Sequence, residues 1–347
     1  MSFQEKNGRY INEMEKAKMP EIKNAKVSNG GLNLHLEFVQ FPVSFVNALR
    51  RILLSGIPTV VIRDVQILQN TTQMPHEMMK HRVEMLPVNV RPDDSATIKD
   101  AKIELLMPAI KEDKIITTDD FTINSGNPNL LMKDPEFDTP SLFLKVRAGE
   151  TVHITGRLAV ENDGVSQVST ASTGWKVDPE LAKRERELYV KAHEDDKDAG
   201  RHFDNFLVKR HYYKDEKGRP YWHEMDIESV GVLESKELLR MAVNILKTRV
   251  NEYITEALKN IKHEKDEGVY SISLDMGGHT VGSLLQSIIY YDPDVQFVSY
   301  DIPHPLKPTM VLRISSNKKT PEKILENVKK IVDEYCSVVE NNNGSGV

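Results

Sequence analysis

The feature that most constrains the fold of this sequence is an internal repeat of a helix followed by a strand. Residues 44–54 place apolar side chains on one face of a predicted helix, and residues 280–289 do the same. The alternative is that any amphipathic helix before a strand produces such a resemblance. A shift of 235 positions nevertheless aligns seven pairs without a gap: Val46 and Val281, Leu49 and Leu284, Leu53 and Ile288, Leu54 and Ile289, Pro58 and Pro293, Val60 and Val295, Ile62 and Phe297.

A long amphipathic helix follows each copy. Residues 234–261 carry apolar side chains at helical spacing, and so do residues 320–339, which begin with a favourable Thr320–Pro321 start. Long apolar stripes need partners, because exposed ones are a liability. We therefore predict an α+β fold in which two similar dimerisation domains pair as a pseudo-twofold dimer within one chain. The predicted interface comprises Phe45, Leu49, Leu53, Val281, Leu284, Leu285 and Ile288.

The domain limits follow from the distance between the repeats. About 170 residues separate the first copy from the helix at 234, which is too long for a loop. The predicted organisation is a first dimerisation domain at 20–69 and 163–262, an inserted β-rich domain at 70–162, and a second dimerisation domain at 268–340.

Within the insert we expect strands at 101–107 and 114–123, and a hairpin of 141–146 with 151–160 around the turn at 147–150. The highly charged segment 180–198 is predicted to be a solvated helix and loop, or alternatively a docking surface. The tail at 341–346 is expected to fray.

The composition indicates a soluble protein whose main task is not to grip nucleic acid. Hydrophobic residues make up 39% of the 347 residues, enough for real cores, and the formal net charge is −6. Cys336 is the single cysteine, so an intramolecular disulfide and a cysteine zinc site are excluded. The first 20 residues are polar and no run of 18 apolar residues occurs, so we expect an intracellular protein without membrane contact.

Three motifs suggest chemistry, but each lacks a necessary element. His76 and His81 are five residues apart, whereas a zinc-binding helix needs a spacing of four. The glycine-rich stretch 277–283 has a serine where a phosphate-binding loop needs lysine. The acidic turn 292–294 ends a predicted helix, which favours a turn over a magnesium site. No nucleophile is paired with a base, so we predict no enzymatic activity, no cofactor and no metal.

The first copy resembles a known family. Residues 47–54 and 57–59 are similar to the first helix of the alpha-type subunits of cellular RNA polymerases. These subunits are bacterial alpha, archaeal D and the third-largest subunit of eukaryotic polymerase II. The resemblance extends through Asn70-Thr71-Thr72, Pro75, Glu77, His81-Arg82 and Leu86-Pro87, with Glu84 where the family usually has glycine.

The C-terminal part resembles the smaller partner of that family, archaeal L or the eleventh subunit of polymerase II. The similarity rests on His279 to Leu285, Asp292-Pro293, Val298 to Tyr300, Pro303 to Leu306 and Thr320-Pro321. Cells encode the two partners separately, and fusions are known among large DNA viruses of eukaryotes. By analogy we expect a viral protein, working in the host cytoplasm or nucleus and packaged in the virion. The zinc loop of the eukaryotic third subunit is not carried over, because its cysteines are missing.

The resemblance implies a non-catalytic platform for polymerase assembly. Its expected partners are the largest and second-largest subunits and small subunits of the tenth and twelfth types, with DNA contacted only through the complex. The expected docking residues are Asn47, Arg50, Arg51, His81 and Arg82. For the arginines the alternative is a solvated helix face, and for His81-Arg82 we favour a structural role in ordering the insert. Two rival functions remain: a stand-alone transcription-regulatory module, and a nucleotide-handling enzyme that uses the glycine-rich stretch.

Overall fold

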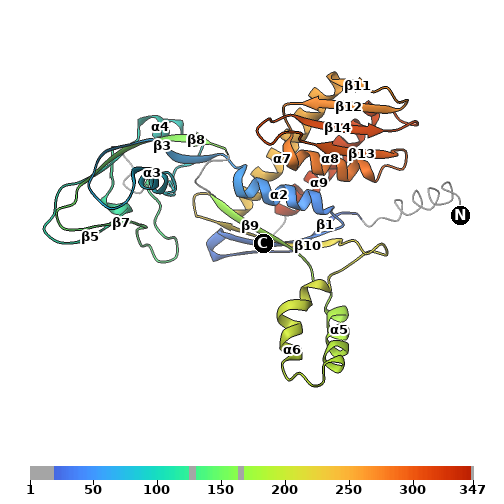
Figure 1. Ribbon diagram of the computed structural model, residues 1–347, viewed down its shortest axis with the longest axis horizontal. Coiled ribbons are helices and arrows are strands. Elements are labelled where there is room, and N and C mark those ends of the chain that lie inside the picture. Colours follow the sequence, from blue (N-terminus) through green and yellow to red (C-terminus); the bar gives the residue numbers. More distant parts are fainter. Residues whose placement is uncertain (1–18, 125–129, 163–167, 345–347) are drawn as a thin grey trace.

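The computed structural model describes residues 19–124, 130–162 and 168–344. Two four-stranded antiparallel sheets lie on opposite sides of a group of helices (Figure 1). A β-rich lobe extends from one side of this arrangement, and a helical hairpin projects from the first sheet. The mixture of helices and strands confirms the predicted α+β class.

The first sheet presents an apolar face to the helices. Leu34, Leu36 and Phe38 alternate along one strand and are buried. The preceding turn (η1, Asn29–Gly31) holds Gly30 at a φ of 59°, which glycine adopts without strain. The sheet order is β1 (Glu21–Ser28), β2 (Asn33–Val39), β10 (Trp222–Ser229) and β9 (Ser169–Trp175), and its helices are α2 (Val43–Ser55) and α7 (Ser235–Lys259).

The second sheet is built from the C-terminal part of the chain. Its first helix starts after Gly277, whose φ is 97°. A β-carbon there would lie 2.9 Å from the Met310 side chain and 3.0 Å from the Tyr253 ring, so glycine also permits close packing. The sheet order is β11 (Ile261–His263), β12 (Val269–Leu274), β14 (Met310–Ser315) and β13 (Phe297–Asp301), and its helices are α8 (Gly278–Tyr290) and α9 (Pro321–Gly344).

The two sheets have the same strand order. Each begins with an edge strand and continues with the strand before the short helix, the strand before the long helix, and a final strand. The 235-residue shift also maps the bounds of α2 onto those of α8. The helical part of the predicted repeat is therefore confirmed.

A strand follows each of the two short helices, as predicted, but the two strands do not occupy equivalent places in the fold. Val60 and Ile62 lie in β3 (Thr59–Asn70), which pairs with β8 (Val152–Glu161) in the lobe. The strand of the first sheet that corresponds to β13 is β9, because each pairs with the strand before the long helix. The apolar pattern predicted a strand after the helix correctly, but it carries no information on which sheet that strand joins.

The lobe, defined as residues 59–161, has its own hydrophobic core, separate from the core between the two sheets. The pairing of β3 with β8 includes Thr59, so this sheet begins before the predicted domain limit at residue 70. Its sheets have the orders β3-β8-β4-β6 and β5-β7, and its remaining elements are α3 (His76–Glu84), α4 (Ser95–Asp100), β4 (Lys102–Met107), β5 (Lys114–Thr117), η2 (Thr118–Asp120), β6 (Thr122–Ile123) and β7 (Leu142–Val146).

The hairpin predicted around residues 147–150 does not form. The turn is present, with Gly149 at a φ of 82° and the Glu150 amide bonded to the Arg147 carbonyl. The flanking strands belong to different sheets, however, because β7 pairs with β5 whereas β8 pairs with β3 and β4. A turn sequence specifies the reversal of the chain, but not whether the two flanking strands hydrogen-bond to each other.

The second predicted domain limit also lies inside a structural unit. Residues 261 and 262, assigned to the first domain, belong to β11, which pairs with β12 of the second sheet. Only Asn260 separates this strand from the end of α7. At the other end, α9 continues to Gly344, so residues 341–344 of the predicted frayed tail are helical.

The helical hairpin lies between β9 and β10 and is called the projection. Asp178 begins its first helix, where its carboxylate accepts hydrogen bonds from the amides of Glu180 and Leu181. This agrees with the predicted solvated helix in the charged segment. The projection contains α5 (Pro179–Ala192), α6 (Ala199–His202), a π-helical turn η3 (Phe203–Leu207) and η4 (Val208–Arg210).

Candidate assembly interface

Four helices meet between the two sheets and share one hydrophobic core. α2 contacts α7 and α8, and α9 contacts α7 and α8, so each half of the chain packs against the other. Figure 1 shows this group near the middle of the molecule. The residues predicted for the interface all lie in this core and are at most 8% exposed: Phe45, Leu49, Leu53, Val281, Leu284, Leu285 and Ile288.

Aromatic rings extend this core between α2 and α9. The rings of Phe41 and Phe45 stack with their centroids 5.4 Å apart. Tyr335 of α9 lies 5.4 Å from Phe41 and 5.3 Å from Phe45, within the range of favourable aromatic pairs. Burial, with a smaller contribution from the charge of Glu334, raises the pKa of the Tyr335 phenol, so the ring remains neutral in the interface.

The single cysteine belongs to the same interface. Cys336 of α9 is fully buried, and this burial raises the pKa of its thiol to about 12. A thiol that stays protonated is a poor nucleophile and a poor metal ligand, so Cys336 acts as a small apolar side chain.

The outer face of α2 carries the predicted docking residues Asn47, Arg50 and Arg51. The Asn47 side chain accepts hydrogen bonds from Nε and Nη2 of Arg50, at 3.1 and 3.0 Å. Arg51 is exposed and donates from Nε to the hydroxyl oxygen of Thr280 on α8, at 2.9 Å. The structure therefore brings these three residues together, and it connects Arg51 to the other half of the chain.

The corresponding positions of α8 carry no cation. At a shift of 235 residues, Asn47, Arg50 and Arg51 of α2 correspond to Gly282, Leu285 and Gln286 of α8. Leu285 is buried, and Gln286 carries no charge. The two halves therefore share a backbone arrangement but present chemically different surfaces.

His81 and Arg82 lie on α3 of the lobe, away from the four helices. Both are exposed, and within the described part of the chain neither side chain has a hydrogen-bond or ion-pair partner. These observations give no support to the structural role that the sequence favoured.

Glu84, which stands where the family usually has glycine, connects α3 to β3 through an ion pair. Its carboxylate pairs with Arg63 of β3 at 3.0 Å, and the Arg63 Nε donates to Glu161 of β8 at 2.6 Å. The hydrogen bonds that Arg63 donates to Glu161 are the main reason that the pKa of the Arg63 guanidinium lies well above its usual range. Sequence reasoning noted the unusual residue but had no means of identifying its partner in a distant strand.

The glycine-rich stretch 277–283 has a packing role. A β-carbon on Gly282 would come within 2.5 Å of the Tyr300 ring and 2.7 Å of the Met310 sulfur. The space next to this glycine is therefore filled by protein side chains. This finding gives no support to a nucleotide-handling enzyme.

The acidic residues 292–294 form a turn, as predicted. Asp292 is buried and accepts the Asp294 amide, and Lys319 donates to both Asp292 oxygens at 2.8 and 3.0 Å. Lys319 also pairs with Asp294 at 3.1 Å. Lys319 therefore compensates carboxylate charge within the chain, and its contacts connect the end of α8 to the start of α9.

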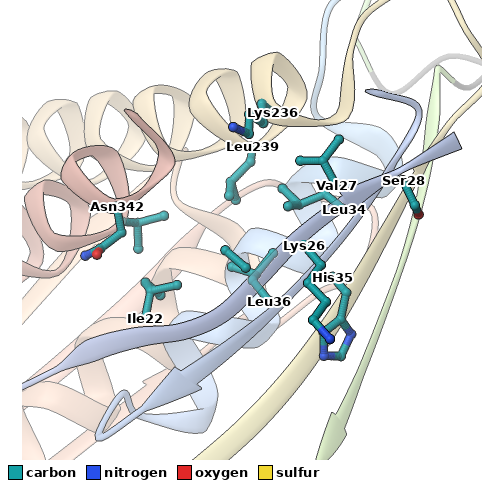
Figure 2. Close-up of a pocket in the computed structure, with 12 residues that line it drawn as sticks. Ile22, Lys26, Val27, Ser28, Leu34, His35, Leu36, Lys236, Leu239 and Asn342 are labelled. Atoms are coloured by element: carbon teal, nitrogen blue, oxygen red, sulfur yellow. The ribbon is translucent and has the colours of Figure 1, made fainter. Parts of the chain in front are cut away.

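A pocket of about 650 Å³ opens between the β1–β2 hairpin and the ends of α7 and α9 (Figure 2). Its walls are mainly apolar, with Leu34, Leu36 and Leu239 facing one another, and Lys26 and His35 lie at its edge. The lining contains no carboxylate, so it offers no acid–base pair for catalysis.

The projection brings together aromatic and histidine side chains that the sequence analysis did not connect. Tyr189 of α5 stacks on His193 at 4.2 Å, and its hydroxyl lies 3.1 Å from His202 Nδ1. Arg186 binds Asp204 through two hydrogen bonds of 2.8 and 3.0 Å. In the sequence, the only sign of this contact was the spacing of four between Tyr189 and His193, which places both side chains on one face of a helix. These contacts hold the two helices side by side.

Two structural features are absent from the described ranges. No group of three or more His, Cys, Asp or Glu side chains in residues 19–124, 130–162 and 168–344 is arranged to hold a metal ion. In the same ranges, no helix combines the length and the apolar character needed to cross a membrane.

Comparison with known families identifies the fold of the four-helix region. A model described as the RNA polymerase Rpb3/Rpb11 dimerisation domain matches residues 35–250, which is more than half of the chain. The chain belongs to this family. A second model with the same description matches residues 270–342, so α2 lies in the first matched segment and α8 in the second. The predicted resemblance to alpha-like RNA polymerase subunits is thereby confirmed.

Individual relatives give the same picture. The chain is 23% identical over 263 residues to a protein of Pyrococcus horikoshii, covering 69% of this chain and 98% of the relative. It is 25% identical over 238 residues to a Pyrococcus furiosus protein, covering 62% and 90%. A Methanocaldococcus jannaschii protein is 43% identical over 51 residues, only 15% of this chain and 27% of the relative. All three are named DNA-directed RNA polymerase subunit Rpo3.

Proposed function

We propose that the chain is a non-catalytic assembly platform of a multisubunit DNA-directed RNA polymerase. Its two halves pair with each other and dock the largest and second-largest subunits, which carry the active site. The observation that carries this proposal is the one hydrophobic core shared by α2, α7, α8 and α9, in a chain of the polymerase dimerisation family. DNA is contacted through the complex, and small subunits of the tenth and twelfth types complete the partner set.

The proposal includes a fusion of two partners in a pseudo-twofold arrangement. The identical strand order of the two sheets and the 235-residue shift between α2 and α8 support it. We propose a first dimerisation domain at 20–58 and 168–260, the lobe at 59–161 as its insertion, and a second dimerisation domain at 261–344. The viral source expected from known fusions stays a prediction.

Docking is assigned to cations at the surface of the first half, of which Arg50 is partly exposed and Arg51 is exposed. Arg50 and Arg51 on α2 offer guanidinium groups that can bind a carboxylate through two parallel hydrogen bonds. His81 and Arg82 on α3 are exposed and supply a second contact on the lobe. We propose that the second-largest subunit binds the α2 face. The equivalent positions of α8 carry no cation, and this difference between the halves gives the platform a direction.

Co-purification tests the platform. A tagged chain expressed in its native setting should capture the largest and second-largest polymerase subunits in equal amounts. A stand-alone regulatory module would instead be recovered without them, and that result would overturn the proposal. Mass spectrometry of the native complex gives both the partners and their stoichiometry.

Charge reversal tests the docking face. Arg51→Glu should leave the fold intact, because an exposed substitution usually changes stability by no more than about 0.5 kcal/mol. Repulsion at the contact should weaken capture of the second-largest subunit at least roughly tenfold. Lys329→Glu, an exposed charge reversal on α9, serves as the control. Equal capture by the wild type and both variants would show that Arg51 is not at the contact.

A further inference from the structure

The two arginines on the outer face of α2 are held in different ways. Arg50 is fixed by Asn47 of its own helix, through two hydrogen bonds to one oxygen. Arg51 is fixed by Thr280 of the opposite half, through a single bond from Nε. The orientation of Arg50 is therefore a local property of α2. The orientation of Arg51 depends on the packing of α8 against α2.

The bond to Thr280 leaves the functional end of Arg51 available. Nε is the inner nitrogen of the guanidinium, and within the described residues no hydrogen bond or ion pair holds Nη1 or Nη2. These two terminal nitrogens are the pair that can contact a carboxylate side by side. Thr280 itself is partly buried in the first turn of α8. Its hydroxyl oxygen is therefore held in position to accept the hydrogen bond from Arg51.

The surroundings of Arg51 favour an anionic ligand. Thr280 lies in the first turn of α8, where backbone amides carry a partial positive charge. The exposed His279 is its neighbour in this turn. Arg51 and the helix start together form a site that spans both halves and matches a carboxylate of a partner.

We propose that Thr280 is a positioning residue for docking: it orients Arg51 to bind a carboxylate of the second-largest subunit. This inference rests on the proposed platform function. It makes docking conditional on internal pairing, because Arg51 receives its orientation only when α8 lies against α2. A chain whose halves have not paired then presents a mobile arginine and binds the large subunit weakly.

Thr280→Val tests this role, because valine keeps the shape of threonine but cannot accept the hydrogen bond. Binding to the purified second-largest subunit should weaken roughly three- to tenfold, the effect of leaving one long side chain unordered before binding. Thr280→Ser restores the acceptor and should bind like the wild type. Ser283→Ala, one turn further along α8, is the matched control. The thermal midpoint of each variant shows whether the two halves remain packed.

A double-mutant cycle separates positioning from a general structural effect. In an Arg51→Ala background, Thr280→Val should cause no additional loss, because there is no guanidinium left to orient. Equal binding by Thr280→Val and the wild type would overturn the inference, and so would an equal loss in both backgrounds. If Arg51→Ala alone does not weaken binding, the proposed docking face fails as well. These outcomes therefore distinguish failure of the positioning role of Thr280 from failure of the docking face on α2.

Discussion

Glu37 shows at the scale of one residue how the first sheet stabilises a buried charge. The carboxylate of β2 is 2% exposed and accepts hydrogen bonds from Lys176 at 2.7 Å, Trp222 at 2.9 Å and Asn24 at 3.0 Å. Burial alone would raise its pKa, but these donors, led by Lys176, outweigh burial and lower the pKa below 4.5. A buried carboxylate without such partners would be strongly destabilising.

Replacing Glu37 by glutamine should lower the free energy of unfolding at pH 7 by about 1–3 kcal/mol, because charge-assisted hydrogen bonds are lost. A lowered native pKa gives stability that is present above the unfolded pKa and lost as the pH falls through the native value. The difference between wild type and variant should therefore shrink below about pH 4.5. Urea unfolding at several pH values measures this. A difference that stays constant down to pH 3 would contradict the assignment, and Glu228→Gln, at an exposed position of β10, is the control.

At the scale of elements, the sequence predicted the helices well and the sheets poorly. The apolar residues of α2, α7, α8 and α9 recur every three or four positions, so one segment is enough to find each helix. Sheet membership depends on residues far apart in the chain. For that reason the strand after α2 was included in the first dimerisation domain although it pairs in the lobe, and the turn at 147–150 was interpreted as a hairpin.

The same contrast applies to the candidate site. The pair Arg50–Arg51 and the apolar interface residues were found from local sequence and a family resemblance. The hydrogen bond between Arg51 and Thr280 was not, because 229 residues separate its partners. Glu84 was noticed only as an unusual residue, and its ion pair with Arg63 required the packed lobe.

Leu284→Asp tests the contact between α2 and α8. Leu284 is fully buried, so the substitution buries an unpaired charge at a cost of several kcal/mol. A domain is stable by only about 5–15 kcal/mol, so the helices should separate. Limited proteolysis should then reveal new cleavage near residues 45–55, in the other half of the chain. Tyr290→Asp changes an exposed residue of the same helix and should leave the digestion pattern unchanged. Continued protection of 45–55, while residues 268–344 are degraded, would show that the halves fold independently.

At the scale of the whole molecule, the two halves are connected by helix packing and by β11, the strand of the second domain that follows α7. The helices pack across the core, and β11, which follows α7 after one residue, pairs with β12 through Ile261 with Ile272 and His263 with Tyr270. Three residue pairs of a short edge strand bury little surface, whereas the helices bury large side chains such as Tyr253 and Phe45 in the shared core. The helices should therefore provide most of the association.

Two split forms of the chain separate these contributions. Co-expressed fragments 1–265 and 266–347 keep β11 on the first fragment, so strand pairing and helix packing both cross the cut. Fragments 1–259 and 260–347 move β11 to the second fragment, and only helix packing crosses the cut. If the helices supply the contact, both pairs should co-elute in size-exclusion chromatography at micromolar concentration. Leu284→Asp should release the fragments in either form. Co-elution of the first pair alone would assign the association to β11. Separate elution of folded fragments in both forms would remove the internal dimer on which the platform depends.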